Sequence, residues 1–388
     1  MTTHPSISPH SLAAPALAVT LILASFVFPL HSEARAQTEA AADSTMPIDY
    51  NDGPHVFWQN DSVAIVFYWC ENVLDTQRFI VSDTLRFTGR CGDTGLVYTV
   101  PRVLPEPAPS TYDGVSRIFA VSDIHGEYEY LSDLLTRSGV IDAAGHWSWG
   151  DGHLVIVGDI FDRGDKVTEC LWLVYRLEQE ALRDGGRVHF ILGNHDWMPL
   201  RGDYRYVNEK YTDGIARKTR IRYEDLFGAD MELGRWLQSR DTAVRINGIL
   251  FIHGGAAPFL VDRGLGLDAL NDSVRPSIDM RSSQMAFSDL PKLLFGSVGP
   301  FWYRGFFEAS EGRYPLATDE DIDRVLAFYD ADAVVVGHTG VEHVASLRGG
   351  RVIGIDVPYE DLSCLEGLLW ESGRFYRVTG AGERVPLE

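Results

Sequence analysis

The chain has 388 residues, of which 34 are Lys or Arg and 55 are Asp or Glu, so its formal net charge is −21. With 45% apolar residues and four Cys, its composition is that of a globular protein and excludes collagen-like, coiled-coil and wholly disordered chains. The negative charge argues against general nucleic-acid binding and against docking on an anionic membrane, because both need clustered Lys and Arg. A phosphorylated substrate would therefore have to be attracted by local charges.

The N-terminal segment has the features of an export signal. An apolar stretch runs from Leu12 to Leu30 and is followed by Ala34-Arg35-Ala36, the small-x-small pattern of a cleavage site. We expect residues 1–36 to be a signal peptide, so that the mature protein is periplasmic or secreted and is not stably inserted in a membrane. An uncleaved membrane anchor is the alternative, because the stretch approaches spanning length.

Residues 37–114 differ from the rest of the chain. Residues 37–47 are small and polar and are expected to form a flexible lead. From 48 to 103, short apolar runs separated by turn residues predict a small β-rich region, and a Pro-rich linker over 104–114 follows it. Cys70 and Cys91 both lie in the β-rich region, and the sequence leaves open whether they form a disulfide or are each buried.

Beyond the linker, residues 115–388 predict one large domain. Strands first alternate with helices, the pattern of a largely parallel sheet covered on both faces. The last part instead predicts antiparallel hairpins that turn at Asn247-Gly248, Gly349-Gly350 and Ser372-Gly373. We therefore expect an α/β fold in which two mixed β-sheets pack as a sandwich flanked by helices. The expected early elements are strands at 118–121, 154–157 and 188–192 and helices at 127–137 and 166–182.

Polar clusters follow five of the predicted strands. The first three are separated by one strand–helix–strand step each, which is 34 residues from His125 to Asp159 and 35 from Asp159 to Asn194. They should therefore meet at one carboxyl edge of the sheet, where open α/β sheets bind ligands. The five clusters are Asp123-Ile124-His125, Gly158 to Gly164, Gly193-Asn194-His195-Asp196, His253-Gly254-Gly255 and Gly337-His338-Thr339.

The residue types in these clusters favour a metal site. Asp, Asn and His together offer oxygen and nitrogen donors without thiolate, which suits Mn, Fe or Zn. One bridging Asp can hold two such divalent or trivalent ions about 3.5–4 Å apart, the spacing of two-metal phosphoryl chemistry. A lone Asp-x-His would more often be structural, and five other histidines are expected to be ordinary core or surface residues: His55, His146, His153, His189 and His343.

The combined set D-x-H, G-D-x-x-D-R-G, G-N-H-D, H-G-G and G-H-T resembles the calcineurin-like metallophosphoesterases. Within them it is most similar to the phosphoprotein-phosphatase branch and its bacterial Shewanella-like members, to which residues 200–207 and 299–305 are also similar. The resemblance covers about residues 115–358 and implies a metallophosphoesterase catalytic domain. It implies that metal one is held by Asp123, His125 and the bridging Asp159, and metal two by Asp159, Asn194, His253 and His338.

The same resemblance implies roles for the remaining polar residues. His195, oriented by Asp162, would protonate the leaving oxygen. Arg163 and Arg304 would clamp the phosphate oxygens. Asp196 departs from the pattern, because the family more often has Glu there, and the contact that this side chain makes beyond the metal ligands is left open.

The expected activity is that of a metal-dependent phosphatase. It would hydrolyse phosphomonoesters, on phosphorylated Ser, Thr or Tyr of proteins, by direct attack of a hydroxide that bridges the two metals. A diadenosine-tetraphosphate hydrolase is the alternative, because it resembles the same branch and shares nearly every ligand. A further interpretation makes the β-rich region a docking module for a partner, and residues 264–296 are expected to form a partly helical cap that shapes substrate choice.

Overall fold

The computed structural model describes residues 49–91, 95–104, 106–278, 289–359 and 364–387. The expected signal peptide and flexible lead therefore lie outside the described residues. The chain divides by its internal contacts into Met1–Pro47 and Ile48–Glu388, and the second unit contains all the elements below. Among the described residues, none of the helices has both the length and the apolar character needed to cross a bilayer.

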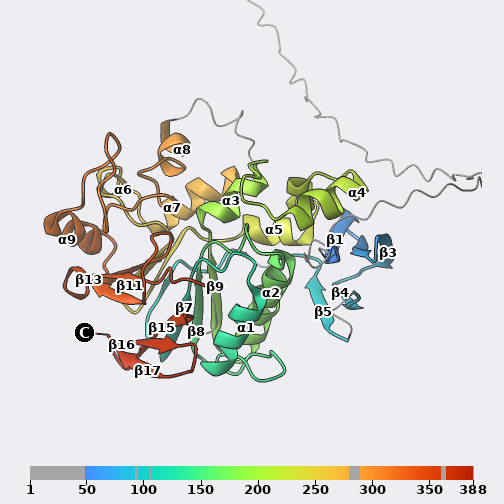
Figure 1. Ribbon diagram of the computed structural model, residues 1–388, viewed down its shortest axis with the longest axis horizontal. Coiled ribbons are helices and arrows are strands. Elements are labelled where there is room, and N and C mark those ends of the chain that lie inside the picture. Colours follow the sequence, from blue (N-terminus) through green and yellow to red (C-terminus); the bar gives the residue numbers. More distant parts are fainter. Residues whose placement is uncertain (1–48, 92–94, 105, 279–288, 360–363, 388) are drawn as a thin grey trace, which may run out of the picture. The chain divides into compact units, whose positions relative to one another are not determined.

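Two six-stranded mixed sheets lie at the centre of this unit, as the sequence predicted (Figure 1). In the first sheet three parallel strands form one side and antiparallel strands form the other, whereas in the second sheet three parallel strands lie at the middle. The first sheet has the order β17 (Arg384–Pro386), β16 (Arg374–Thr379), β15 (Glu366–Glu371), β7 (Arg117–Val121), β8 (His153–Val157) and β9 (Arg187–Ile191). The second has the order β13 (Ala345–Leu347), β14 (Val352–Gly354), β12 (Ala333–Val336), β11 (Ile249–Ile252), β10 (Ala243–Ile246) and β6 (Thr111–Tyr112).

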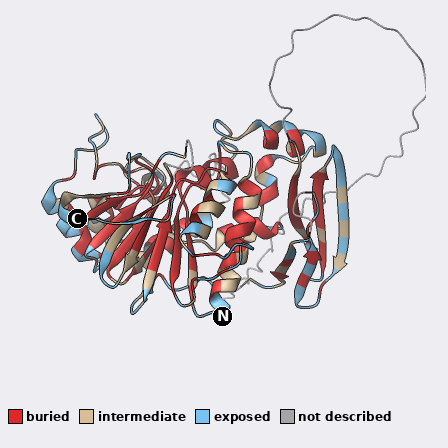
Figure 2. Cartoon of the chain, turned by 60° about the horizontal axis from the view of Figure 1, so that its bottom comes forward, coloured by how far each residue is buried: buried red, intermediate tan, exposed pale blue. Residues whose placement is uncertain are grey.

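Alternation along the strands explains why the two sheets form a sandwich. In β7, Ile118 and Ala120 pack in a core with Phe251 and other residues of the second sheet. Phe119 and Val121 of the same strand pack in the other core, together with residues of the helices. Both faces are buried (Figure 2), which is why these strands are continuous apolar runs in the sequence.

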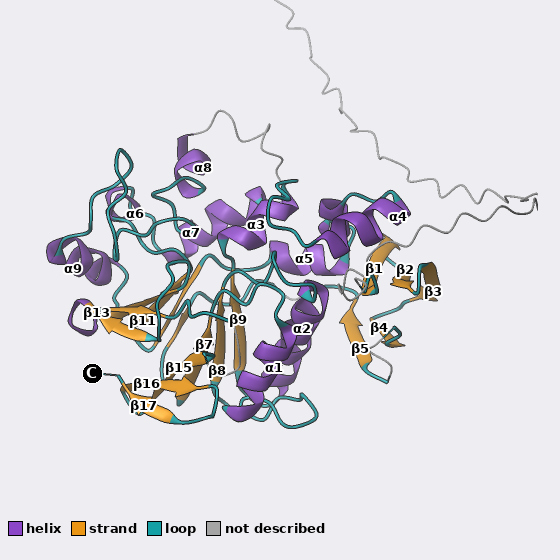
Figure 3. Cartoon of the chain, viewed as in Figure 1, coloured by secondary structure: helices purple, strands orange, loops and turns teal. Residues whose placement is uncertain are grey.

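Helices cover the sheets and the edge where the parallel strands end. Helices α1 (Tyr128–Arg137) and α2 (Val167–Arg183) lie alongside the first sheet, as predicted (Figure 3). The other α-helices are α3 (Asn194–Leu200), α4 (Arg217–Thr219), α5 (Glu232–Gln238), α6 (Pro258–Asp262), α7 (Leu267–Val274), α8 (Asp289–Leu294) and α9 (Asp319–Phe328). A π-helix, η1 (Lys210–Ala216), and three 3₁₀ turns, η2 (Tyr223–Phe227), η3 (Arg275–Ser277) and η4 (Arg348–Gly350), complete the set in the described residues.

The β-rich region packs into the same core as the main domain. It consists of a three-stranded sheet and a hairpin. Glu232 of α5 is buried and accepts hydrogen bonds from Trp58 Nε1 at 2.6 Å and from the Tyr175 hydroxyl at 2.8 Å, which ties the region to α2 and α5. Trp172 Nε1 adds a hydrogen bond to the Pro54 carbonyl at 2.8 Å. The strands are β1 (Asp52–Asn60), β2 (Val63–Cys70), β3 (Val73–Ile80), β4 (Thr84–Thr88) and β5 (Val97–Pro101).

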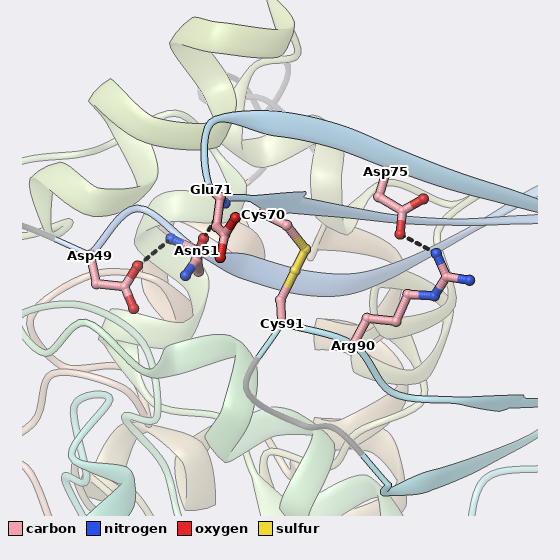
Figure 4. The surroundings of a disulfide bond; sticks show 7 residues. All are labelled: Asp49, Asn51, Cys70, Glu71, Asp75, Arg90 and Cys91. Atoms are coloured by element: carbon pink, nitrogen blue, oxygen red, sulfur yellow. Dashed lines mark hydrogen bonds and ion pairs between the residues drawn. A yellow bond between two sulfur atoms is a disulfide. The ribbon is translucent and has the colours of Figure 1, made fainter.

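Two details of this region refine the sequence analysis. Thr111 and Tyr112, which fall in the expected linker, form β6 at the edge of the second sheet. Cys70 and Cys91 form a disulfide with their Cα atoms 5.7 Å apart, which decides between the two alternatives left open by the sequence (Figure 4). Close to this bridge, Asn51 Oδ1 accepts a hydrogen bond from the backbone N–H of Glu71 at 2.7 Å.

Two histidines of the first sheet pair with each other in the interior. His189 Nε2 lies 3.0 Å from His153 Nδ1, and the ring of Tyr112 packs edge-on against both imidazoles. Burial, assisted by the charge of Arg187, lowers the pKa of His153 to about 4. Burial and the neighbouring His153 likewise lower the pKa of His189. The pair is therefore structural, as expected for histidines outside the five clusters.

This pair predicts loss of stability in mild acid. In the unfolded chain each of these imidazoles takes up a proton near pH 6.5, whereas in the folded protein His153 does so only near pH 4. The free energy of unfolding should therefore fall as the pH drops from about 6.5 to about 4. Replacing one imidazole in His153→Gln should reduce this loss by about 2 kcal/mol between pH 7 and pH 4.5. Urea denaturation at both pH values measures the effect, and an identical pH dependence in both proteins would contradict it.

Candidate active site

The structure brings the five predicted clusters together at one edge of the sandwich. Asp123 and His125 follow β7, Asp159 follows β8, and Asn194 and His195 begin α3 directly after β9. His253 follows β11 and His338 follows β12 in the second sheet. The site thus lies where the parallel strands of both sheets end, as expected for an open α/β architecture.

Much of the site backbone adopts the left-handed region. Non-glycine residues rarely have positive φ, and such conformations persist where the surrounding structure enforces them, often at functional sites. Hydrogen bonds such as Asp123 N–H to Gly158 O at 3.0 Å and His125 N–H to Asp159 O at 2.8 Å hold these loops. The site residues with positive φ are Asp123, His125, Asp159, Asp162, Arg163 and His338.

The carboxylate of Asp159 lies at the centre of the site. It can share a cation with His125 and His195 on one side and with His253 and His338 on the other, since the ligand atoms of each group lie within 4.8 Å of one another. Its Oδ1 atom accepts a hydrogen bond from the backbone N–H of His195 at 2.8 Å. Asp159 therefore has the position that a bridging ligand requires.

The atoms around His253 Nε2 require a positive charge between them. Its Nδ1 donates a hydrogen bond to the Val157 carbonyl at 2.7 Å, so in the neutral ring Nε2 carries a lone pair. Yet Nε2 faces two oxygen atoms, Asn194 Oδ1 at 3.0 Å and Asp159 Oδ2 at 3.2 Å. Burial alone would lower the pKa of His253, but the Asp159 and Asp123 carboxylates raise it to about 10. A proton or a metal ion is needed to hold these three atoms together.

The other predicted ligands show the same demand for positive charge. His125 Nδ1 donates to the Phe161 carbonyl at 2.9 Å, which leaves Nε2 free on the side of Asp123 Oδ1, 4.0 Å away. His338 Nε2 is buried and has no hydrogen-bond partner among the described residues. Burial lowers the pKa of His338 to about 2, so this ring stays neutral and keeps its lone pair. Carboxylates, an amide oxygen and neutral imidazoles are the donor set of Mn, Fe or Zn, so these residues fit a metal centre.

The groups expected to act on the substrate surround this centre. Asp162 Oδ2 lies 2.7 Å from His195 Nδ1, which must donate to the carboxylate, so His195 Nε2 is the atom available for proton transfer. Arg163 donates its backbone N–H to the Tyr206 carbonyl at 2.8 Å, and the Tyr206 ring packs edge-on against His195. Arg304 is close enough to His338 to help keep that imidazole neutral, which places its positive charge near the centre.

Comparison with known proteins agrees with this geometry. The family model described as calcineurin-like phosphoesterase matches residues 116–342, more than half of the chain. The chain belongs to the calcineurin-like phosphoesterases. The predicted family and the predicted sandwich of two mixed sheets are thereby confirmed.

Several phosphatases are similar over more than half of the chain. The crystal structure of a cold-active protein-tyrosine phosphatase from a psychrophilic Shewanella species is 36% identical, covers 87% of this chain and 99% of that one, and has a TM-score of 0.79. Shewanella-like protein phosphatase 2 of Arabidopsis thaliana is 25% identical over 71% of this chain and 81% of its own length. Shewanella-like protein phosphatase 1 of Plasmodium berghei is 29% identical over 59% of this chain and 63% of its own length.

The position of Asp196 answers a question that the sequence left open. Its carboxylate is fully buried and accepts hydrogen bonds from four backbone N–H groups around the bridging position. Oδ2 accepts from Asp159 at 2.8 Å and from Gly193 at 2.7 Å, and Oδ1 accepts from Ile160 at 2.8 Å and from Phe161 at 3.2 Å. In this phosphoesterase Asp196 therefore fixes the loop that carries Asp159.

Asp356 was missed in the sequence analysis. It comes just after β14, so the rule that found the other clusters, a polar residue following an apolar strand, could have found it. Burial raises the pKa of Asp356 to about 6, while His253 and the Arg163 and Arg304 guanidiniums act in the opposite direction. Asp356 thus adds a further carboxylate to the site, close to Asp123 and His253 as well as to the two predicted phosphate-binding arginines.

The structure describes only part of the expected cap, residues 264–296. Helix α7, turn η3 and helix α8 lie within 264–296, while residues 279–288 are outside the described residues, so a cap over the site stays a prediction. Phe295, just after α8, stacks on Trp197 of α3 with ring centroids 4.4 Å apart. The end of the expected cap therefore reaches the helix that carries His195.

Removing the charge of Asp196 should loosen the site. In Asp196→Asn, an amide NH₂ replaces one acceptor oxygen and faces backbone N–H groups, so we expect the free energy of unfolding to fall by about 3 kcal/mol. Metal affinity should fall roughly tenfold, as is typical when a residue that orients ligands is changed. Urea denaturation and metal analysis after dialysis measure both effects. Asp184→Asn, which removes the charge of an exposed residue, is the control, and equal behaviour of the two variants would contradict this role.

Proposed function

We propose that this calcineurin-like phosphoesterase is an exported, metal-dependent protein phosphatase. It hydrolyses phosphomonoesters on proteins, with phosphotyrosine as the first candidate and phosphoserine or phosphothreonine as the others. The observation that carries the proposal is a single buried carboxylate, Asp159, shared by two groups of potential metal ligands, one of which includes His195, with two arginines nearby. Support for a phosphotyrosyl substrate comes from the Shewanella tyrosine phosphatase that aligns with 87% of this chain.

Different residues of the chain carry out different parts of the reaction. When bound at this centre, two divalent or trivalent ions such as Mn, Fe or Zn supply the charge that makes hydroxide available from water near neutral pH and that neutralises the phosphate. Arg163 and Arg304 hold the phosphate oxygens, because guanidinium groups match them with paired N–H donors. The attack of hydroxide on phosphorus would be direct, and His195, held by Asp162, would give its Nε2 proton to the leaving oxygen as the bond between that oxygen and phosphorus breaks. None of the chain's side chains becomes phosphorylated.

Positive charge at the site explains how an acidic protein can bind an anionic substrate. The net charge of the chain is −21, but charges farther away than about 8 Å are largely screened at physiological salt. At contact distance the substrate meets two metal ions and two arginines, which outweigh the carboxylates of Asp123, Asp159 and Asp356. The phosphate is therefore attracted at the site although the molecule as a whole repels it.

Activity assays with metal-loaded protein test the proposal. We expect hydrolysis of p-nitrophenyl phosphate and of phosphotyrosyl peptides, loss of both activities in chelator, and a drop in kcat of about 10² to 10⁴ in His195→Asn. His146→Asn, which changes an exposed histidine outside the site, should keep full activity and is the matched control. Undiminished turnover in chelator, or a clear preference for diadenosine tetraphosphate over phosphopeptides, would contradict the proposal.

The export part of the proposal has its own test. The Cys70–Cys91 disulfide supports it, because structural disulfides persist mainly in oxidising compartments. When the full chain is produced in a bacterium with a functional secretion pathway, we expect the periplasmic or secreted protein to begin at Gln37. N-terminal sequencing measures this, and a full-length chain held in the membrane fraction would contradict it.

A further inference from the structure

A polar pocket continues outward from the predicted phosphate-binding residue Arg304. It has a volume of about 580 Å³, enough for a peptide side chain and part of its backbone. The pocket is lined by Phe295, Ser297, Trp302, Arg304, Glu308, Ser310, Arg313 and Tyr314. The edge of the Trp302 ring packs against His338, with ring centroids 5.6 Å apart, so the pocket begins beside the metal centre.

Part of the pocket lining is an anchored turn, Ser310–Tyr314. Ser310 and Tyr314 exchange two backbone hydrogen bonds, at 2.9 and 3.1 Å, and so close a short loop that carries Arg313. The ring of Tyr314 packs edge-on against the buried ring of Tyr303, with centroids 5.1 Å apart. Because Tyr303 is the chain neighbour of Arg304, this contact fixes the position of the Arg313 loop (Ser310–Tyr314) relative to the phosphate-binding arginine.

The lining of this pocket carries a net positive charge, part of which is not neutralised by an ion pair within the described residues. Arg313 is exposed, and its side chain makes no hydrogen bond or ion pair with any residue that the structure describes. Glu308 is the acidic residue of the lining, and it is outnumbered by Arg304 and Arg313. The lining therefore has a formal net charge of +1, although the net charge of the chain is −21.

We propose that this pocket binds a carboxylate side chain of the substrate peptide, a few residues from the phosphorylated one. This inference rests on the proposed protein-phosphatase function and makes its substrate class more specific: phosphopeptides with acidic residues beside the phosphorylated residue. The phosphate occupies the metal centre and Arg304, and the flanking Asp or Glu pairs with Arg313, whose planar guanidinium can bind a carboxylate through two N–H groups. Trp302 and Tyr314 pack against the peptide between these two points.

Matched phosphotyrosyl peptides test this subsite. In each peptide the three residues on one side of the phosphotyrosine, either N-terminal or C-terminal, are all Glu, all Gln or all Lys. The kcat/KM for each peptide is divided by the kcat/KM for p-nitrophenyl phosphate. For one of the two sides we expect the Glu peptide to exceed the Gln peptide by about fivefold, mainly through a lower KM, as for an ion pair near the surface. The preference should shrink at high salt.

Three variants separate the pocket from general charge effects. Arg313→Gln should abolish the preference for Glu, Arg313→Lys should keep part of it, and Glu308→Gln should increase it. Arg374→Gln removes the same charge from an exposed residue at the end of the first sheet where β7 begins, opposite to the end that carries Asp123, so both the preference and the activity should be unchanged.

The outcomes distinguish this inference from the proposed function. Equal hydrolysis of the Glu, Gln and Lys peptides on both sides, or an equal loss of preference in Arg313→Gln and Arg374→Gln, would overturn the subsite and leave the phosphatase standing. Hydrolysis of p-nitrophenyl phosphate without hydrolysis of any phosphopeptide would overturn the protein substrate, and the subsite with it.

Discussion

The arrangement of the site depends on holding one carboxylate, Asp159, between two groups of potential metal ligands in the protein interior. A buried carboxylate surrounded by imidazoles and other carboxylates is costly unless positive charge compensates it. The surrounding structure leaves little freedom for it to move away. A Cβ atom at Gly193 would lie 2.1 Å from Asp159 Oδ1, and one at Gly158 would lie 2.5 Å from His253 Nδ1, so both glycines permit an approach that any other residue would block.

The fold supplies the rigidity that this constraint requires. The strands that lead into the site are buried on both faces, so their ends are fixed by packing in two cores. Asp196 then transfers this rigidity to the loop after β8 through hydrogen bonds to four backbone N–H groups. The proposed substrate-binding residues Arg304 and Arg313 lie outside this frame, on loops, where a change of contacts need not disturb the residues expected to hold the metals.

The sequence predicted the centre of the site better than its surroundings, for a physical reason. The early strands and helices are determined by local periodicity, and equal spacing of the clusters then implies that they meet at one edge. The packing of the β-rich region depends instead on Trp58 and Glu232, which are 174 residues apart, and no local pattern indicates such a contact. Asp356 followed the rule used for the other clusters and was overlooked, whereas the place of Arg313 depends on the contact between Tyr303 and Tyr314, which only the folded chain shows.

The central claim is that two metal ions share Asp159, and metal stoichiometry tests it most directly. Metal analysis of purified, dialysed protein, made together with circular dichroism to confirm folding, should give two ions per chain for the native sequence. The folded Asp159→Asn variant should hold fewer than one ion per chain and lose its phosphatase activity. Fully active native protein with a single ion, or an Asp159→Asn variant that still binds two ions, would contradict the account.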